Sequence, residues 1–153
     1  MAKLTPEQVF DKADAGESLR GADLQGIDLV FSVLDGGDFR RANLQRAQLQ
    51  GAVLEGADLR EADLSQAELD EAGLLDADLS RAILRRAELT AADLRGANLE
   101  EADLREAILE DALVDGEQLR RAESLAGATL PDGTKLSKQG WQQEFEDWLR
   151  KNP

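Results

Sequence analysis

The chain has 153 residues, enough for one domain, and contains no Cys, His or Tyr. Its 32 acidic residues outnumber its 18 basic ones, and the net charge of −14 disfavours direct binding to nucleic acid or to an anionic membrane surface. Without Cys, the chain has neither disulfides nor thiolate metal sites.

Residues 1–16 predict an N-terminal helix that caps the segment behind it. The helix signals are a capping residue, a first-turn proline, a capping-box partner and a terminating glycine: Thr5, Pro6, Gln8 and Gly16. Val9, Phe10 and Ala13 lie on one side of this helix and are expected to cover the next segment. Because this start has no apolar run of signal-peptide length, and no later run would span a bilayer, we expect a cytoplasmic location.

Residues 17–116 repeat every five residues, as in "GADLREADLSQAEL" at 56–69. The third residue of each unit is Leu except at Phe39 and Val114, and the first is Ala in almost every unit. Five residues advance an α-helix by about 140° net, so the leucines would spiral around it. A flat strand would place them on alternate faces. Neither structure buries this pattern.

A chain that turns at every unit does bury it. If each unit is a short extended piece followed by a corner of about 90°, four units close one square coil. Coils stacked about 4.8 Å apart place leucine over leucine inside, with alanine in the tight space beside it. The 20 units therefore predict an all-β solenoid of five coils. Phe39 supports this arrangement, because the one aromatic core residue shares its unit with Gly37, which leaves the space that a larger ring needs.

The segments "GADLREADLS" and "RGANLEEADLR" match the pattern A-(D/N)-L-x-x, and the chain resembles the pentapeptide-repeat family. The resemblance covers about two thirds of the chain. It implies a right-handed quadrilateral β-helix, whose hand the periodicity alone does not give. The segment "SLAGATLPDGTKL", followed by a Trp-rich helix, is similar to the C-terminal ends of cyanobacterial members.

Residues 117–153 predict C-terminal capping helices and a turn. Asp115 and Gln118 have capping-box spacing, which favours a helix over 117–125, and "PDGT" at 131–134 predicts a turn. Residues 138–150 predict an amphipathic helix. Its apolar stripe consists of Trp141, Phe145, Trp148 and Leu149. Helices at both ends would cover the open backbone groups of the coil and prevent end-to-end stacking.

The four faces of the predicted solenoid differ in charge, and each is named here after its first leucine. The Leu19 and Leu24 faces carry most of the arginines together with columns of Asp. The Leu29 face has acidic outward residues and no Lys or Arg. Its carboxylates, called the acidic face below, are Asp28, Glu68, Asp70, Glu71, Glu88, Glu110 and Asp111. This face is interpreted as a docking surface for a basic partner, as a solvated face that aids solubility, or as a ladder for divalent cations.

The Leu34 face has the fewest charges and a candidate apolar patch. The patch consists of Val33, Val53, Leu75 and Leu113. A terminal helix lying over it, or a homodimer seam, would explain its composition. Val30 and Phe31 lie at a corner of the first coil and are expected to meet the N-terminal helix.

The sequence contains no pattern that predicts catalysis. The missing His, Cys and Tyr remove the common general base, the usual nucleophile pairs and the common zinc ligands. Phosphate-loop and dinucleotide fingerprints are also missing. A convex prism with a solid leucine core offers no cleft that would perturb paired carboxylates. We therefore predict no catalytic, cofactor-binding or metal-binding residues.

Two functions fit these features. The first is a non-catalytic rigid scaffold, monomeric or dimeric, that presents charged faces to a protein partner. The second, suggested by the family resemblance, is an acidic DNA mimic that binds and inhibits a type II topoisomerase such as DNA gyrase. The net charge favours mimicry, whereas the short rod, the absence of loops between coils and the capped ends disfavour it.

Overall fold

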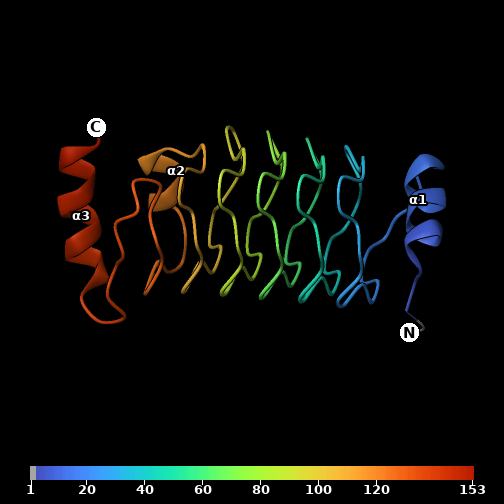
Figure 1. The fold of residues 1–153 in the computed structure, drawn as a ribbon, viewed down its shortest axis with the longest axis horizontal. Helices are drawn as coiled ribbons and strands as arrows, with labels where there is room; N and C mark the ends of the chain where they lie inside the picture. Colours follow the sequence, from blue (N-terminus) through green and yellow to red (C-terminus); the bar gives the residue numbers. More distant parts are fainter. Residues whose placement is uncertain (1–2) are drawn as a thin grey trace.

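In the computed structural model, which describes residues 3–153, the chain winds into a row of coils between two terminal helices (Figure 1). Parallel bridges join second-position residues 20 apart, such as Asp58 and Asp78, on all four sides of the coil. Within the described residues these bridges stay isolated and no continuous strand forms, because each unit turns after its third residue. The four-sided coil is confirmed, and its hand stays a prediction.

The unit around Leu59 shows why the coil is stable. Asp58 N–H donates to Gly37 O of the preceding coil at 2.9 Å, and Leu59 N–H donates to Asp78 O of the following coil at 2.8 Å. The N–H of Arg60, in the fourth position, donates to the Asp58 carboxylate at 3.3 Å. Asp or Asn in the second position therefore accepts the one N–H that the ladder between coils leaves over.

Each corner is a tight turn with a left-handed residue. Ala62 N–H donates to Leu59 O at 3.0 Å, and Glu61 between them has a φ of 58°, as in a type II turn. Every fifth position from 21 to 111 has a positive φ. A side chain in this conformation costs about 1–2 kcal/mol, so the coil depends on its interior for stability.

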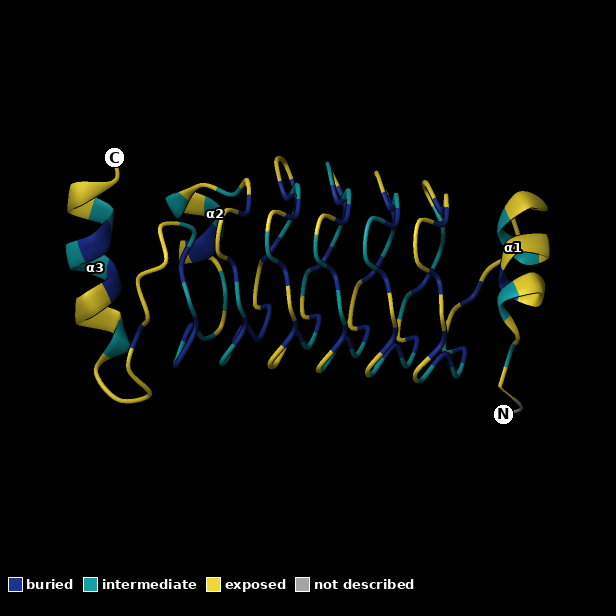
Figure 2. Cartoon of the chain, in the orientation of Figure 1, coloured by how far each residue is buried: buried dark blue, intermediate teal, exposed yellow. Residues whose placement is uncertain are grey.

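The interior consists of the predicted leucine and alanine columns. Leu64 and Leu84, one coil apart, are both fully buried, and buried positions recur along every coil in Figure 2. Each buried leucine contributes about 2 kcal/mol. Phe39 is buried as well, and a Cβ at Gly37 would lie 2.5 Å from its Cε2 atom. The predicted match between the large ring and the missing methyl is confirmed.

α1 (Pro6–Asp14) caps the first coil and has the predicted start and end. Thr5 and Gln8 form the capping box, and Gly16, with a φ of 68°, ends the helix in a Schellman motif. Val9 is buried against the core. The prediction for Phe10 is wrong: its side chain is exposed, because the buried stripe of this short helix is narrower than expected.

The coil continues past residue 116, where the sequence pattern placed its end. α2 (Gly116–Arg120) begins with the predicted capping box, in which Gln118 N–H donates to Asp115 at 2.8 Å. The sequence predicted a helix that continues to residue 125, but α2 ends at Arg120.

The chain then returns to the repeat geometry with a changed register. Ser124 bridges to Asp103 and Thr129 bridges to Ile108, an offset of 21 residues instead of 20. The α2 segment therefore absorbs one extra residue. The coil resumes because the apolar residues that follow have a core to cover, and these buried residues are Leu125, Ala128 and Leu130.

α3 (Trp141–Lys151) caps the other end, as the amphipathic pattern predicts. Phe145 and Trp148 are buried with their rings stacked at 5.8 Å, and Trp141 and Leu149 pack at the edge of the core. The predicted turn at 131–134 precedes α3, and Leu130 N–H donates across it to Thr134 O at 2.8 Å. In the described part of the chain, none of the helices has the length and apolar character needed to cross a bilayer.

Candidate functional site

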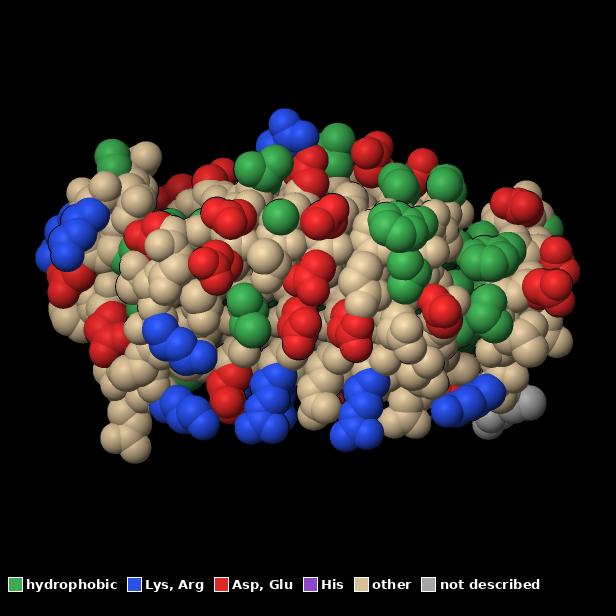
Figure 3. All heavy atoms as spheres, in the orientation of Figure 1, with side chains coloured by type: hydrophobic (Ala, Val, Ile, Leu, Met, Phe, Trp, Pro, Cys, Tyr) green, Lys and Arg blue, Asp and Glu red, His purple; other side chains and the backbone are tan. Residues whose placement is uncertain are grey.

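The structure brings the residues of the acidic face onto one side of the coil. Asp28, Glu68 and Glu88 occupy second positions, and a bridge joins Glu68 to Glu88 in the next coil. Asp70 and Glu110 occupy fourth positions, and Glu71 and Asp111 occupy fifth positions. Figure 3 shows carboxylates spread over the middle of this view, with Lys and Arg gathered mostly along its lower edge.

The carboxylates of the acidic face have no basic partner. Within residues 3–153, none of the seven forms an ion pair with Lys or Arg. Their contacts are neutral: Asp28 accepts from Val30 N–H at 3.2 Å, and Asp70 accepts from Thr90 N–H at 2.9 Å. Their charge is therefore not neutralised within the described chain.

On the Leu19 face, in contrast, Asp and Arg form a ladder. Arg40 donates two bonds of 2.8 Å to Asp38, and its Nε also lies 3.5 Å from Asp58 in the next coil. Arg60 repeats this arrangement with Asp58. These hydrogen bonds hold the pKa of Asp38 and Asp58 below the usual range, because they favour the charged carboxylate.

Asp103 on the Leu24 face is a residue that the sequence interpretation missed. We expected second-position residues to face solvent, yet Asp103 is only 3% exposed because Arg85 and Arg105 both cover it. Burial raises the pKa of Asp103, but hydrogen bonds from Arg105 and Arg85 outweigh this effect and lower it to about 2. The sequence signal that could have found this site is the pair Arg85 and Arg105, which lie one coil apart in equivalent positions.

The predicted apolar patch forms only in part. Val33 and Val53 are bridged neighbours, but Gly73 and Asp93 follow them in the same column and separate them from Leu113. Leu75 lies in a different position of its unit and is half-buried. The structure therefore contains a Val33–Val53 pair and an isolated Leu113 instead of one patch.

No terminal helix of residues 3–153 covers these residues, which corrects the sequence interpretation. Val33 is 67% exposed and Leu113 is 49% exposed, since α1 and α3 lie across the ends of the stack (Figure 1). The same correction applies to Phe31, which is 76% exposed and was expected to meet α1. A helix that closes the end of a coil leaves little chain to cover its sides.

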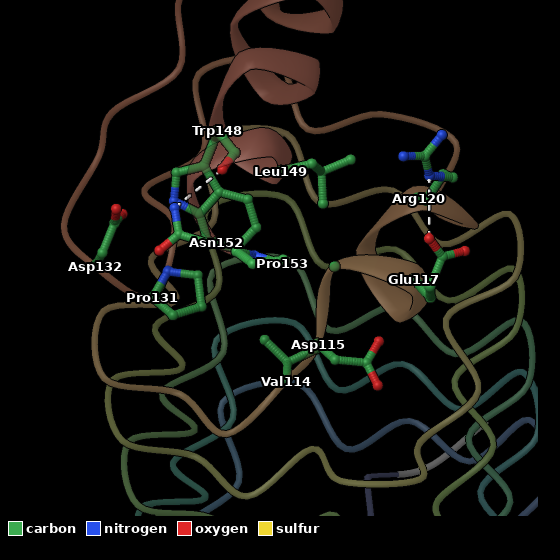
Figure 4. Close-up of a pocket in the computed structure, with 11 residues that line it drawn as sticks. Val114, Asp115, Glu117, Arg120, Pro131, Asp132, Trp148, Leu149, Asn152 and Pro153 are labelled. Atoms are coloured by element: carbon green, nitrogen blue, oxygen red, sulfur yellow. Dashed lines mark hydrogen bonds and ion pairs between the residues drawn. The ribbon is translucent and has the colours of Figure 1, made fainter.

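A hollow that the sequence did not predict lies at the C-terminal end. It has a volume of about 590 Å³ and lies between α2, the turn at 131–134 and α3 (Figure 4). Its wall includes Trp148, whose indole Nε1 is buried without an acceptor among residues 3–153. Pro131 and Leu149 add apolar surface, and Asp132 adds a carboxylate. Within the described chain, no group of three or more acidic side chains is gathered as a metal site requires.

Comparisons with known proteins agree with this architecture. The family model for pentapeptide repeats matches eight copies between residues 18 and 111. The structure is similar to Rfr23, a pentapeptide repeat protein from the cyanobacterium Cyanothece 51142, with 35% identity and a TM-score of 0.57. That match covers 58% of this chain and 60% of Rfr23.

Two further comparisons differ in strength. The alr5209 protein from Nostoc PCC 7120 is 35% identical over 85% of this chain and 78% of its own, with a TM-score of 0.51. QnrB1, a plasmid-mediated fluoroquinolone resistance protein, is 19% identical over 86% of this chain and 83% of its own, with a TM-score of 0.41. None of the curated proteins compared with the chain matches it. With repeats matched over more than half of its length, the chain belongs to the pentapeptide-repeat family.

Proposed function

We propose that the protein is a non-catalytic rigid scaffold that binds a basic protein partner through its acidic face. The observation that carries this proposal is the set of seven carboxylates that have no Lys or Arg partner within residues 3–153. A partner that brings Lys and Arg to this face forms new ion pairs without breaking existing ones. We further take the coil to be right-handed and the protein to act in the cytoplasm.

The presence of Glu at second positions of the acidic face supports this proposal. On the Leu19 face, second-position Asp accepts a backbone N–H, as Asp58 does from Arg60. Glu68 and Glu88 occupy the equivalent position with one more methylene, which carries the carboxylate away from this local bond. Neighbouring charges about 5 Å apart repel by less than about 1 kcal/mol in water, so the coil tolerates them. Their summed field attracts a cationic partner over a distance of about 8 Å at physiological salt.

The experiment neutralises four of the seven carboxylates of the acidic face and measures binding of a fluorescent 20-residue peptide of alternating Lys and Ser. The acidic-face variant combines Glu68→Gln, Asp70→Asn, Glu71→Gln and Glu88→Gln. The control variant removes the same charge elsewhere with Glu7→Gln, Asp76→Asn, Glu100→Gln and Glu123→Gln. We expect the acidic-face variant to bind about tenfold more weakly at low salt and the control to bind like the wild type. Equal losses in both variants would show that net charge alone attracts the peptide.

DNA mimicry is the second candidate, and the net charge of −14 favours it. The Leu19 face argues against it, because its Asp residues are already paired with Arg and present no continuous negative column. A supercoiling assay with purified DNA gyrase tests this candidate. Inhibition at micromolar protein would establish mimicry, and normal supercoiling together with unrelieved quinolone poisoning would dismiss it.

A further inference from the structure

Phe31 is the most exposed large apolar side chain of the described residues. It is 76% exposed, and Val30 before it and Val33 two residues after it are also exposed. The bridge between Val33 and Val53 extends the apolar surface into the second coil. This group, called the Phe31 cluster below, consists of Val30, Phe31, Val33 and Val53. It lies at the corner between the acidic face and the Leu34 face.

The ring of Phe31 has a defined position. A Cβ at Gly51, one coil away, would overlap the ring at Cδ1 and Cε1, so the absence of a side chain at Gly51 makes room for it. Phe31 occupies a fifth position with a φ of 55°. All the remaining fifth positions from 21 to 111 hold Gly, Ala, Gln or a charged residue. A bulky aromatic in this left-handed conformation gains little from burial here, and its rigidity suits it for contact with another molecule.

The surroundings of the Phe31 cluster are acidic. Residues 21–39 contain no Lys or Arg. Asp28 and Asp35 flank the cluster in the first coil, Glu55 lies in the second, and Glu71 occupies the fifth position two coils beyond Phe31. None of these four carboxylates forms an ion pair with a basic residue of 3–153. The apolar surface is therefore bordered by unneutralised negative charge.

We propose that the Phe31 cluster anchors the partner, by inserting Phe31 into an apolar socket that Lys and Arg surround. This inference rests on the proposed function and adds the residues that would select one basic partner over others. The charges favour a basic protein over a second copy of this chain, because a symmetric dimer would bring two acidic borders together. Aromatic residues at the centre of an interface with charges at its rim are a common arrangement of binding hot spots.

The test uses two peptides of equal charge. The polar probe is the Lys-Ser peptide described above, and the apolar probe replaces half of its serines with leucine. The variant is Phe31→Asn, because Asn tolerates a positive φ and should leave the thermal unfolding temperature unchanged. Leu113→Ser is the control, since it removes another exposed apolar side chain from the distant end of the coil. Binding is measured by fluorescence anisotropy, and contacts are mapped by amide chemical shifts.

We expect the wild type to bind the apolar probe at least about tenfold more tightly than the polar one. Phe31→Asn should abolish this difference, Leu113→Ser should keep it, and the shifts should be centred on residues 30–33 and 51–53. If both probes bind equally and Phe31→Asn changes neither, the anchor is wrong and the scaffold proposal stands. If neither probe binds, both the Phe31 anchor and the scaffold proposal are wrong. A dimer in sedimentation equilibrium that Phe31→Asn dissociates would identify a second copy as the occupant and overturn the inference.

Discussion

Arg40 holds Asp38 with two hydrogen bonds on the Leu19 face, whereas Asp28, Glu68 and Glu88 on the acidic face have no basic partner among the described residues. The backbone is the same on both faces, with bridges 20 residues apart and the same corners. Surface ion pairs are therefore not what closes the coil. The interior and the backbone ladder do that, and one face is thereby free to keep a charge that a partner can use.

The largest expected effect is at Asp103, where a paired carboxylate is also buried. Asp103→Asn keeps the shape and the backbone acceptor but leaves Arg85 and Arg105 without their shared anion. We expect a loss of about 2–3 kcal/mol in the free energy of unfolding, measured with urea. Glu88→Gln on the acidic face is the matched control and should change it by less than about 0.5 kcal/mol. Equal losses in the two variants would remove the distinction between the faces.

Gly37→Leu changes the interior while leaving the charge of every face intact. The new side chain would collide with Phe39, whose Cε2 lies 2.5 Å from the position of a Cβ at Gly37. We expect overpacking to lower the unfolding free energy by about 1–3 kcal/mol. The double variant Gly37→Ala with Phe39→Leu restores the Ala–Leu pair of the other units and should unfold thermally near the wild-type temperature. A double variant that is destabilised as much as Gly37→Leu would mean that backbone strain at residue 37, and not core volume, is responsible.

Acid should destabilise the protein through protonation of Asp103. Its folded-state pKa of about 2 lies below the ordinary value, so its contribution is fully present above about pH 4 and is lost as the pH falls through 2. Between pH 5 and pH 2 the wild type should lose about 1–2 kcal/mol more stability than Asp103→Asn. Urea unfolding of both proteins at several pH values measures this difference, and parallel curves would contradict it.

The smallest expected effect is on the acidic face itself. The four-residue acidic-face variant should be more stable than the wild type by less than about 1 kcal/mol at low salt, because like charges no longer repel. Raising NaCl to about 1 M should remove this gain, since the Debye length then falls to about 3 Å. A variant that unfolds more readily than the wild type would show that these carboxylates support the coil.

Much of the fold is predictable from particular residues. The Leu and Ala columns, the Gly37–Phe39 match and the buried stripe of α3 follow from spacing and side-chain volume. The start and end of α1 follow from its capping residues. The acidic face was predictable because a fixed period assigns each residue to one side of the coil. The register shift after α2 was not, since one extra residue in a short helix leaves no periodic signal. The hollow beside Trp148 depends on how α3 meets the last coil.

The coil follows from the repeat, because a five-residue period with one large and one small apolar residue can be buried only by a chain that turns at every unit. Which outward residues are paired and which are exposed depends on contacts between coils and between the coils and the terminal helices. Asp103 is buried because Arg85 reaches it from the preceding coil, and Phe31 is exposed because α1 covers an end of the stack and not its side. Such contacts join residues about 20 positions apart, and a long side chain there has several neighbours within reach. The sequence alone therefore does not identify its partner.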